Sequence, residues 1–324
     1  MTQTARWLLT MACSLLSLCS LNAAAQSWPV RPVRMVVPYA PGGGPDVLAR
    51  LLGQYLSDSL GQQFIVDNRP GAGGIAAAEI TAKAPPDGYL MFFSDIQQLA
   101  INPAMFSRLS YDPLRDFAPV SLAGSIPLFI VAQASLPVNN LAELVSYARA
   151  NPGKLTYGSS GVGSIHHIAM ESLKASLGID VVHVPYKGAG QSVPAFLGGE
   201  VPLVVSAYTA LANHVKTGKV KLIAVTSSNR VPQAPEAGAV AELVAGFNYS
   251  SEMGVVMPAG TPPEIIQKLS GEIGRGLNSP DIARRLNTMG VVTIASSPEA
   301  YAQNIRANLQ QFARAVKVSG ATVE

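Results

Sequence analysis

The chain has 324 residues, a charged fraction of 13% and a formal net charge of +3. No run of Lys and Arg exceeds two residues, which argues against a nucleic-acid partner. The length predicts two domains, and the composition is typical of a neutral globular protein.

Residues 1–25 have the pattern of a secretory signal peptide. Arg6 precedes a mostly apolar stretch, and the alanines at 23–25 supply the small residues of a cleavage site. The stretch is too short for a membrane anchor, which needs about 20 apolar residues. We therefore predict export to the periplasm with removal of this segment, and we exclude it from the fold.

Both cysteines, Cys13 and Cys19, lie inside the predicted signal peptide. A lipoprotein signal requires a small residue directly before the cysteine, and Leu18 argues against Cys19 in that role. The exported chain, from about Gln26, would have no disulfide, no thiol nucleophile and no cysteine metal ligand. Its stability must then come from its core alone.

Short apolar runs alternate with segments of helical periodicity along the rest of the chain. The strand candidates are Arg34–Tyr39, Phe64–Val66, Tyr89–Phe93, Leu128–Ala132, Leu155–Tyr157, Val181–Val184, Leu203–Ser206, Leu222–Thr226 and Gly254–Met257. The helix candidates are the apolar face from Leu48 to Leu56, Leu141–Ala150, Ile165–Leu173, Pro262–Leu277 and Pro298–Val318. This alternation predicts an α/β fold with mainly parallel sheets that helices cover on both faces.

Two similar glycine-rich turns occur in the chain. In each, a strand leads through the turn, PGGGPD at 41–46 or GSSGVGS at 158–164, into the N-terminus of a helix. Glycine lets a ligand approach the backbone closely, and the first helical turn has unpaired N–H groups and a partial positive charge. Such a turn binds anions without Arg or Lys. We expect Ser164 to cap the second helix, and Gly44 to cap the first with Pro45 directly after it.

The recurrence of these turns favours a ligand-binding function. Two turns on separate lobes could hold the two ends of a dicarboxylate, or one carboxylate from both sides. A single turn of this kind is structural more often than not, because doubly wound folds contain many of them. Two turns in an exported chain without a catalytic set shift the balance toward binding.

A third glycine cluster, GAGGIA at 71–76, matches the dinucleotide fingerprint G-x-G-x-x-A. Asp95 lies near the spacing expected of a ribose-binding acid. However, residues 68–70 separate the preceding strand from the first glycine, where the fingerprint has an immediate turn. We therefore favour a structural turn and predict no cofactor.

Catalytic and metal-binding patterns are sparse. The four histidines are His166, His167, His183 and His214, and none has the spacing of a metal-binding motif. GSSG at 158–161 lacks the last glycine of a nucleophile elbow, and neither Asp46 nor Asp95 has an evident nucleophile to assist. We predict neither catalytic residues nor a metal site, and an enzyme remains an alternative.

Eight segments carry a resemblance that spans essentially the whole chain after the signal. They are PYAPGGGPDVLAR at 38–50, NRPGAGG at 68–74, PDGYLM at 86–91, YDPLRDFAPVSL at 111–122, NPGKLTYGSSGVGSIHHIAME at 151–171, HVPYKGAG at 183–190, LGGEVPL at 197–203 and MPAGTPPEI at 257–265. In order and spacing they resemble the substrate-binding receptors of tripartite tricarboxylate transporters, the group first named after Bordetella uptake genes.

The resemblance implies a Venus-flytrap fold of the second periplasmic-binding-protein type, with the ligand cleft between two doubly wound lobes. The chain would cross between the lobes near Gly124–Ile126 and near Thr226–Ser228. Lobe 1 would comprise residues 31–125 and 228–324, and lobe 2 residues 126–227. A monomer is expected.

The resemblance also implies that backbone amides and water from the two glycine-rich turns hold a ligand carboxylate. By position, the binding residues would be Ala40, Pro41, Gly42, Gly43 and Asp46 in the first turn, and Ser159, Ser160, Gly161, Gly163 and Ser164 in the second, with His167 nearby. Further candidates for specificity, at the ends of other strands, are Ser94, Asp95, Ala207 and Tyr208. The NRPGAGG and HVPYKG segments resemble family scaffold rather than ligand contacts.

One departure from the family pattern affects the ligand. Pro45 stands where relatives often have Ser or Thr, so a hydroxyl and an N–H are missing from the first turn. If Asp46 faced the cleft, it would repel a second carboxylate or accept a hydrogen bond from a ligand amine or hydroxyl. Dicarboxylates and tricarboxylates, aromatic carboxylates and amino acids all stay open.

The partners that the resemblance implies are a small carboxylate and a membrane permease of the same transporter class. A ligand sensor that presents its closed form to a signalling partner would use the same cleft, and it stays open as an alternative.

Overall fold

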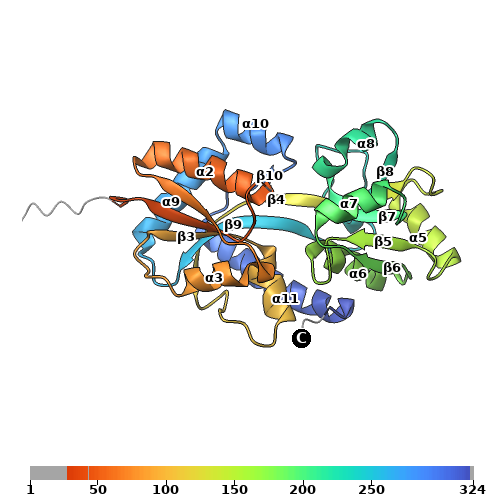
Figure 1. Cartoon of the computed structure of the whole chain (residues 1–324), viewed down its shortest axis with the longest axis horizontal. Helices are drawn as coiled ribbons and strands as arrows, with labels where there is room; N and C mark the ends of the chain where they lie inside the picture. Colours follow the sequence, from red (N-terminus) through yellow and green to blue (C-terminus); the bar gives the residue numbers. More distant parts are fainter. Residues whose placement is uncertain (1–27, 43, 322–324) are drawn as a thin grey trace, which may run out of the picture.

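The computed structural model describes residues 28–42 and 44–321. The predicted signal peptide with both cysteines, and the candidate ligand residue Gly43, lie outside the described residues. In the part of the chain that is described, no helix is long and apolar enough to cross a membrane. Figure 1 shows two lobes joined by the strands β4 (Phe117–Gln133) and β9 (Ser250–Pro258), with the helix α11 (Pro298–Ser319) alongside both.

Lobe 1 is built on three parallel strands, β1 (Val33–Val37), β2 (Phe64–Asn68) and β3 (Leu90–Asp95). They lie in the order β2-β1-β3, and β9 continues the sheet antiparallel to β3. Successive side chains of a strand point to opposite faces, so each face has its own core. The helices α2 (Gly44–Leu60) and α9 (Pro263–Leu277) cover one face, and α3 (Ile75–Ala82) with the first half of α11 covers the other.

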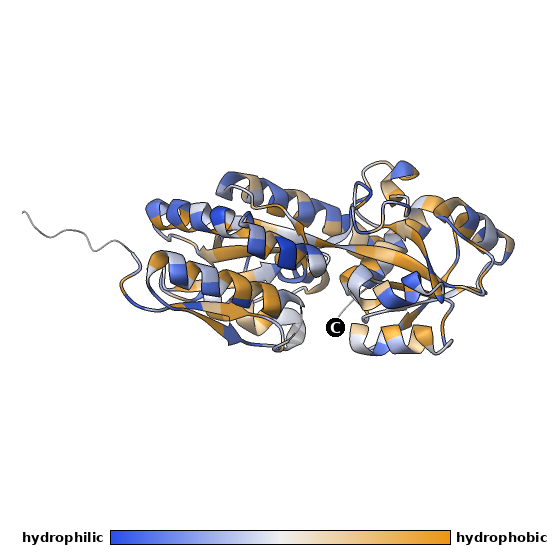
Figure 2. Ribbon diagram, turned by 90° about the horizontal axis from the view of Figure 1, so that it is seen from above, coloured by the Kyte–Doolittle hydropathy of each residue, from blue (hydrophilic) through white to orange (hydrophobic). Residues whose placement is uncertain are grey.

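Lobe 2 repeats this plan. The parallel strands β6 (Val182–Pro185), β5 (Thr156–Ser159) and β7 (Leu203–Ala207) are followed by β4, which pairs antiparallel with both β7 and β8 (Val220–Val225). The helices α5 (Leu141–Ala150) and α6 (Ile165–Leu177) contribute to one core, and α7 (Ala189–Leu197) contributes to the other. Figure 2 shows the result, with apolar strands inside and polar helix faces outside in both lobes.

The remaining elements are short. They are η2 (Ala72–Gly74), the π-helix η3 (Gln97–Ile101), α4 (Asn102–Met105), η4 (Tyr208–Ala210), α8 (Ala212–Lys216), η5 (Val240–Glu242), α10 (Pro280–Thr288) and β10 (Val292–Thr293). The predicted strands and long helices match observed elements. The predicted parallel pairing is found only among three strands in each lobe, β2, β1 and β3 in lobe 1 and β6, β5 and β7 in lobe 2. The crossing strands β4 and β9 run antiparallel to each other, β9 is antiparallel to β3, and β4 is antiparallel to β7.

The first crossing of the chain lies next to the predicted position. Up to Pro127, β4 pairs with β9 of lobe 1, and from Leu128 onward it pairs with β7 of lobe 2. The second crossing comes later than expected at Thr226–Ser228. Residues 231–249 still pack in lobe 2, where Val231 joins the core around Phe129, so the chain returns to lobe 1 only with β9.

The C-terminal helix also departs from the expected division. Tyr301 and Ile305 of α11 pack in lobe 1, whereas Phe312 and Val316 belong to the cluster that contains the lobe 2 core together with Met105 and its neighbours. The predicted assignment of 228–324 to lobe 1 therefore does not describe where 231–249 and the end of α11 pack. An apolar helix face cannot show from sequence alone which of two adjacent cores it enters.

Candidate functional site

A cavity of about 760 Å³ lies between the lobes, at the carboxyl ends of β1, β3, β5 and β7. Ligand crevices of open α/β sheets lie outside these strand ends. The residues that line it are Pro38, Tyr39, Ala40, Pro45, Pro70, Gly71, Gly73, Gly74, Asp95, Ile96, Gln97, Ile126, Leu128, Ser160, Val162, Gly163, Ser164, Ile165, His166, Gly188, Ala189, Ala207 and Ser251.

The structure brings together some of the predicted site residues and places others elsewhere. Those that line the cavity are Ala40, Asp95, Ser160, Gly163, Ser164 and Ala207. Those that do not are Pro41, Gly42, Asp46, Ser94, Ser159, Gly161, His167 and Tyr208.

The turn before α6 has the geometry that its sequence predicts. Ser164 is the N-cap, and its Oγ accepts a hydrogen bond from the amide of His167 at 3.3 Å. Gly161 and Gly163 have backbone φ angles of 122° and 73°, which residues other than glycine rarely adopt. The turn therefore exposes its backbone to the cavity.

Several polar groups of this turn are buried and unsatisfied. Within residues 28–42 and 44–321, Ser160 Oγ and His166 Nδ1 are buried without a hydrogen-bond partner. The amides of Ile165 and His166, in the first turn of α6, have no acceptor in the same part of the chain. Burial lowers the pKa of His166 to about 4, so its imidazole is neutral at neutral pH. The lobe 2 wall thus presents neutral donors at a helix N-terminus, which suits an anion.

The predicted histidine of the site, His167, points away from the cavity, and its neighbour His166 lines the wall instead. His167 Nδ1 accepts a hydrogen bond from the amide of Gly163 at 3.2 Å, and its ring stacks on His183 at 4.0 Å. Adjacent residues of a helix point about 100° apart, so only one of the pair can face the ligand.

Ser159 has a positioning role in the interior. Its Oγ lies 2.6 Å from His183 Nε2 and accepts a hydrogen bond from the amide of Gly161 at 3.0 Å. Ser159 is fully buried, so its hydroxyl cannot reach a ligand in the cavity. With His167, it fixes the turn from behind.

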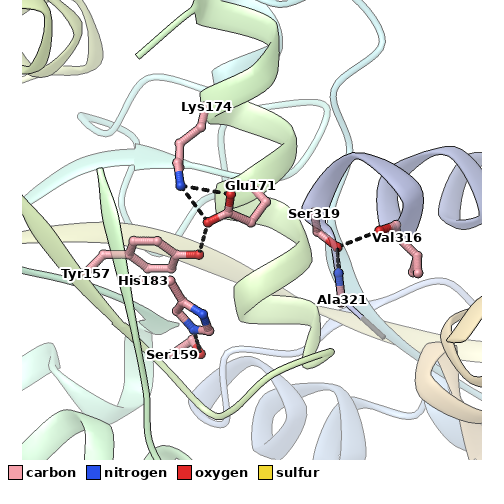
Figure 3. Close-up of polar contacts among 8 residues, drawn as sticks. All are labelled: Tyr157, Ser159, Glu171, Lys174, His183, Val316, Ser319 and Ala321. Carbon is pink, nitrogen blue, oxygen red and sulfur yellow. Dashed lines mark hydrogen bonds and ion pairs between the residues drawn. The ribbon is translucent and has the colours of Figure 1, made fainter. Parts of the chain in front are cut away.

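A polar group of lobe 2 lies beyond this pair (Figure 3). Glu171 of α6 accepts hydrogen bonds from Tyr157 at 2.6 Å and from Lys174 at 2.8 Å. The Tyr157 ring in turn stacks on His183, with ring centroids 4.9 Å apart. Burial and the adjacent Glu171 carboxylate raise the pKa of Tyr157, which therefore stays protonated. Hydrogen bonds and ring stacking thus hold the side chains behind the turn before α6 in place.

The first glycine-rich turn is organised differently. The Asp46 carboxylate is buried and accepts hydrogen bonds from the Gly42 amide at 2.9 Å, Arg50 Nε at 3.0 Å and Asn68 Nδ2 at 2.8 Å. Burial alone would raise the pKa of Asp46, but these hydrogen bonds lower it overall. The chain's own carboxylate thus occupies the N-terminus of α2, and the turn presents Ala40 and Pro45 to the cavity.

Asp95 ends β3 in the lobe 1 wall, and its side chain is only 5% exposed. It accepts hydrogen bonds from the Tyr39 hydroxyl and from the Gln97 amide, the latter at 2.7 Å. Burial raises the pKa of Asp95 to about 6, although these hydrogen bonds oppose the increase. The preceding residue, Ser94, points to the other side of the strand, where its Oγ bonds the Gly254 carbonyl.

The segment that the sequence assigned to scaffold contributes to the cavity wall. Pro70, Gly71, Gly73 and Gly74 line the cavity, and the side chains of Gln98 and Asn102 hold the Gly73 carbonyl at 3.1 Å and 3.0 Å. The available signal was position, because this segment directly follows the carboxyl end of β2. In the HVPYKGAG segment, Gly188 and Ala189 similarly line the lobe 2 side.

The described residues include no group of three or more His, Cys, Asp or Glu side chains that could hold a metal ion.

The sequence matches a family model described as the tripartite tricarboxylate transporter family receptor over residues 48–320. BugT of Bordetella pertussis (strain Tohama I) is 33% identical over 303 residues, which cover 93% of each chain. A protein from the tcbD–tcbE intergenic region of Pseudomonas sp. (strain P51) is 34% identical, and the match covers 90% of this chain and 87% of the relative.

Solved structures give the same result. The R. palustris protein Rpa4515, solved with adipate, is 34% identical with a TM-score of 0.79, covering 91% of this chain and all of that one. The periplasmic binding protein BugD is 32% identical, with a TM-score of 0.75 and coverage of 92% and 100%. MatC from Rhodopseudomonas palustris, with bound malate, is 30% identical, with a TM-score of 0.74 and coverage of 89% and 100%. The expected two-lobed fold of type II periplasmic-binding proteins is confirmed, and the chain belongs to the tripartite tricarboxylate transporter receptor family.

Proposed function

We propose that this protein is a periplasmic receptor that captures a small carboxylate between its lobes and delivers it to a membrane permease of the tripartite tricarboxylate class. The observation that carries the proposal is the lobe 2 wall, where, within the described residues, the Ser160 hydroxyl lies buried without a partner and the first amides of α6 have no acceptor. Buried polar groups are normally satisfied, and a carboxylate would satisfy these. The adipate and malate bound by two relatives support this ligand class.

The mechanism is closure of the two lobes around the ligand. The lobe 2 turn binds the carboxylate, and the lobe 1 wall of Pro38, Tyr39 and Asp95 then closes over the rest of the molecule. A ligand that contacts both lobes favours the closed state by its difference in affinity for the two states. The closed form is the state that a permease would recognise.

Burial argues against catalysis by the nearest serine–histidine pair. Ser159 and His183 are within hydrogen-bond distance, but Ser159 is fully buried and neither residue lines the cavity. A nucleophile must reach its substrate, and this hydroxyl is held by the turn itself. A receptor that signals to a protein partner would share the same cleft, and an interaction experiment with a permease would separate the two functions.

The test is isothermal titration of the purified, ligand-stripped protein with adipate, malate, benzoate and aspartate. We expect saturable binding of at least one, and Ser160→Ala should weaken it about 10-fold or more, because a hydrogen bond to a charged group contributes about 1.5–3 kcal/mol. The matched control is Ser107→Ala, an exposed serine outside the cavity. Equal affinity in wild type and Ser160→Ala would contradict the proposed site, and no binding of any carboxylate would contradict the function.

A further inference from the structure

The walls of the cavity are apolar over most of their area. None of the described lining residues is Lys or Arg. Apolar side chains come from both lobes, and they include Pro38, Pro45, Ile96, Ile126, Leu128, Val162 and Ile165. A ligand carboxylate can therefore be compensated only by the neutral donors of the lobe 2 turn, and the remainder of the ligand lies against apolar surface.

Among the described residues that line the cavity, Asp95 is the one with a carboxyl side chain. Its Oδ1 accepts from the Gln97 amide and its Oδ2 from the Tyr39 hydroxyl. The Gln98 amide also donates to this carboxylate, which has about four acceptor sites in all, so these three donors leave one site for a further donor. Among the described residues, none of these partners of Asp95 is a cation. A second ligand carboxylate on this side would face an uncompensated like charge in an apolar cavity.

The phenols and the imidazole around Asp95 do not change charge near neutral pH. Burial raises the pKa of Tyr39, and also that of Tyr111 and Tyr301, so all three phenols stay protonated. Across the cavity, His166 is neutral above a pKa of about 4. Glu252, on the face of β9 opposite Ser251, has its pKa raised by burial and is hydrogen-bonded to Asn side chains of α11.

We propose that Asp95 selects the group at the far end of the ligand from its bound carboxylate. The receptor takes a monocarboxylate with an apolar body and a hydrogen-bond donor, hydroxyl or ammonium, that reaches Asp95. It discriminates against dicarboxylates, because like charges at close range in an apolar site are strongly unfavourable. A dicarboxylate enters only when Asp95 takes up a proton. This inference rests on the proposed function.

The test compares two matched ligand series by isothermal titration. The aromatic series is benzoate, para-hydroxybenzoate, para-(aminomethyl)benzoate and terephthalate, and the aliphatic series is hexanoate, omega-hydroxyhexanoate and adipate. In the series that binds, we expect a donor-bearing ligand to bind more tightly than its unsubstituted parent at pH 8. The dicarboxylate should bind at least about 10-fold more weakly, a difference of about 1.4 kcal/mol. Comparison of the hydroxyl and ammonium ligands identifies the donor.

Proton uptake gives the dicarboxylate a distinctive pH dependence. With a pKa of about 6 for Asp95, the protonated fraction falls by about 50-fold between pH 6 and pH 8, and the apparent affinity for the dicarboxylate should fall with it. Asp95→Asn should remove this dependence and most of the discrimination. The wild-type pH series stands alone if that variant does not fold.

The outcomes separate this inference from the proposed function. Ser160→Ala should weaken every ligand that binds, whatever its far end, because it acts on the shared carboxylate. If carboxylates bind but the dicarboxylate matches its parent at pH 8 and shows no pH dependence, the role of Asp95 is overturned and the receptor function stands. If no ligand of either series binds, the proposed function fails and the inference fails with it.

Discussion

Gly163 lies at the point where the lobe 2 turn meets the side chain of Met105 in α4. Its φ angle of 73° is unfavourable for any residue with a Cβ, and a Cβ built here would overlap the Met105 side chain. The glycine therefore serves both the shape of the turn and its fit against the neighbouring segment. Because this turn is the proposed carboxylate site, a local shift here should weaken ligand binding.

We predict that Gly163→Ala lowers both stability and ligand affinity. The left-handed backbone costs about 1–2 kcal/mol for a residue with a Cβ. The added methyl group would also overlap the Met105 side chain and displace the turn. The control is Gly218→Ala, where φ is 68° but nothing lies within 4 Å of the added Cβ. Urea unfolding should show a loss in both variants, whereas titration should show weaker binding only for Gly163→Ala. Unchanged affinity in Gly163→Ala would show that the turn does not depend on this contact.

At the residue scale, the sequence predicted the two glycine-rich turns at the strand ends but not the orientation of each side chain within them. The sequence pattern does not show which of the adjacent His166 and His167 faces the cavity. That depends on how α6 is rotated about its axis after its N-cap. Asp46 and Asp95 were both candidates to face a ligand. Asp46 proved to be bonded to Arg50 and Asn68, a residue far along the chain whose approach no local pattern reveals.

At the scale of elements, β9 and α11 connect the two lobes, and a polar group links them beside their apolar contacts. Glu252 of β9 accepts hydrogen bonds from Asn304 at 3.0 Å and from Asn308 at 2.7 Å, both on α11. The neighbouring Ser251 lines the cavity on the opposite face of the strand. One face of β9 therefore lines the cavity, and the opposite face contacts α11.

Asn308→Ala should destabilise the protein by about 2 kcal/mol, the range for a hydrogen bond to a charged group. Burial raises the pKa of Glu252 above its ordinary 4.5, and the bonds from Asn304 and Asn308 oppose the increase. Loss of the Asn308 hydrogen bond raises the pKa of Glu252 further, because it destabilises the ionised carboxylate more than the protonated one. The deficit should therefore be larger at pH 8 than at pH 4, as measured by urea unfolding.

The control for this variant is Gln303→Ala, an exposed position on the same helix. It should change stability little at either pH. A deficit in Asn308→Ala that is equal at pH 4 and pH 8 would mean that the lost contact is packing rather than support of the Glu252 charge.

Strands that lie within one lobe were predictable, and the long crossing strand was not. Only Leu128–Ala132 of β4 has a continuous apolar pattern, because that part is buried in lobe 2. The first half of β4 contains Pro119 and Gly124, residues that usually interrupt a strand, and its register with β9 shifts near each of them. A strand that pairs in two lobes therefore shows two short sequence patterns rather than one long apolar pattern.

At the scale of the whole molecule, three segments cross between the lobes, namely β4, β9 and α11 (Figure 1). One described apolar cluster joins Ile101 and Met105 to the lobe 2 core, the other clusters pack mainly within one lobe, and the cavity takes residues from both lobes. Continuous strands that run from one lobe to the other favour hinge bending rather than internal rearrangement. The fold class followed from the alternation of strands and helices, but the second crossing at Ser250 depended on packing partners that the sequence does not show.

Closure predicts a shorter distance between the lobes when a ligand binds. Cys13 and Cys19, both in the predicted signal peptide, are the two cysteines of the sequence, so cysteines introduced into a protein that begins at about Gln26 can be labelled selectively. Val47 on α2 and Val182 on β6 are exposed, lie in different lobes and do not line the cavity. Spin labels at Val47→Cys and Val182→Cys should give a shorter and narrower distance distribution with saturating carboxylate than without it.

A pair within lobe 1 distinguishes closure from a general tightening of the protein. Val47 and Ile80 lie on helices that cover opposite faces of the same sheet, and both are exposed. Labels at this pair should give the same distance with and without ligand, because the lobe moves as one body. If the pair between the lobes also stays unchanged while titration shows full occupancy, the ligand binds to a cleft that is already closed. The free energy of binding would then come from the fixed geometry of the lobe 2 turn, and a permease would have to distinguish the loaded receptor by features other than its shape.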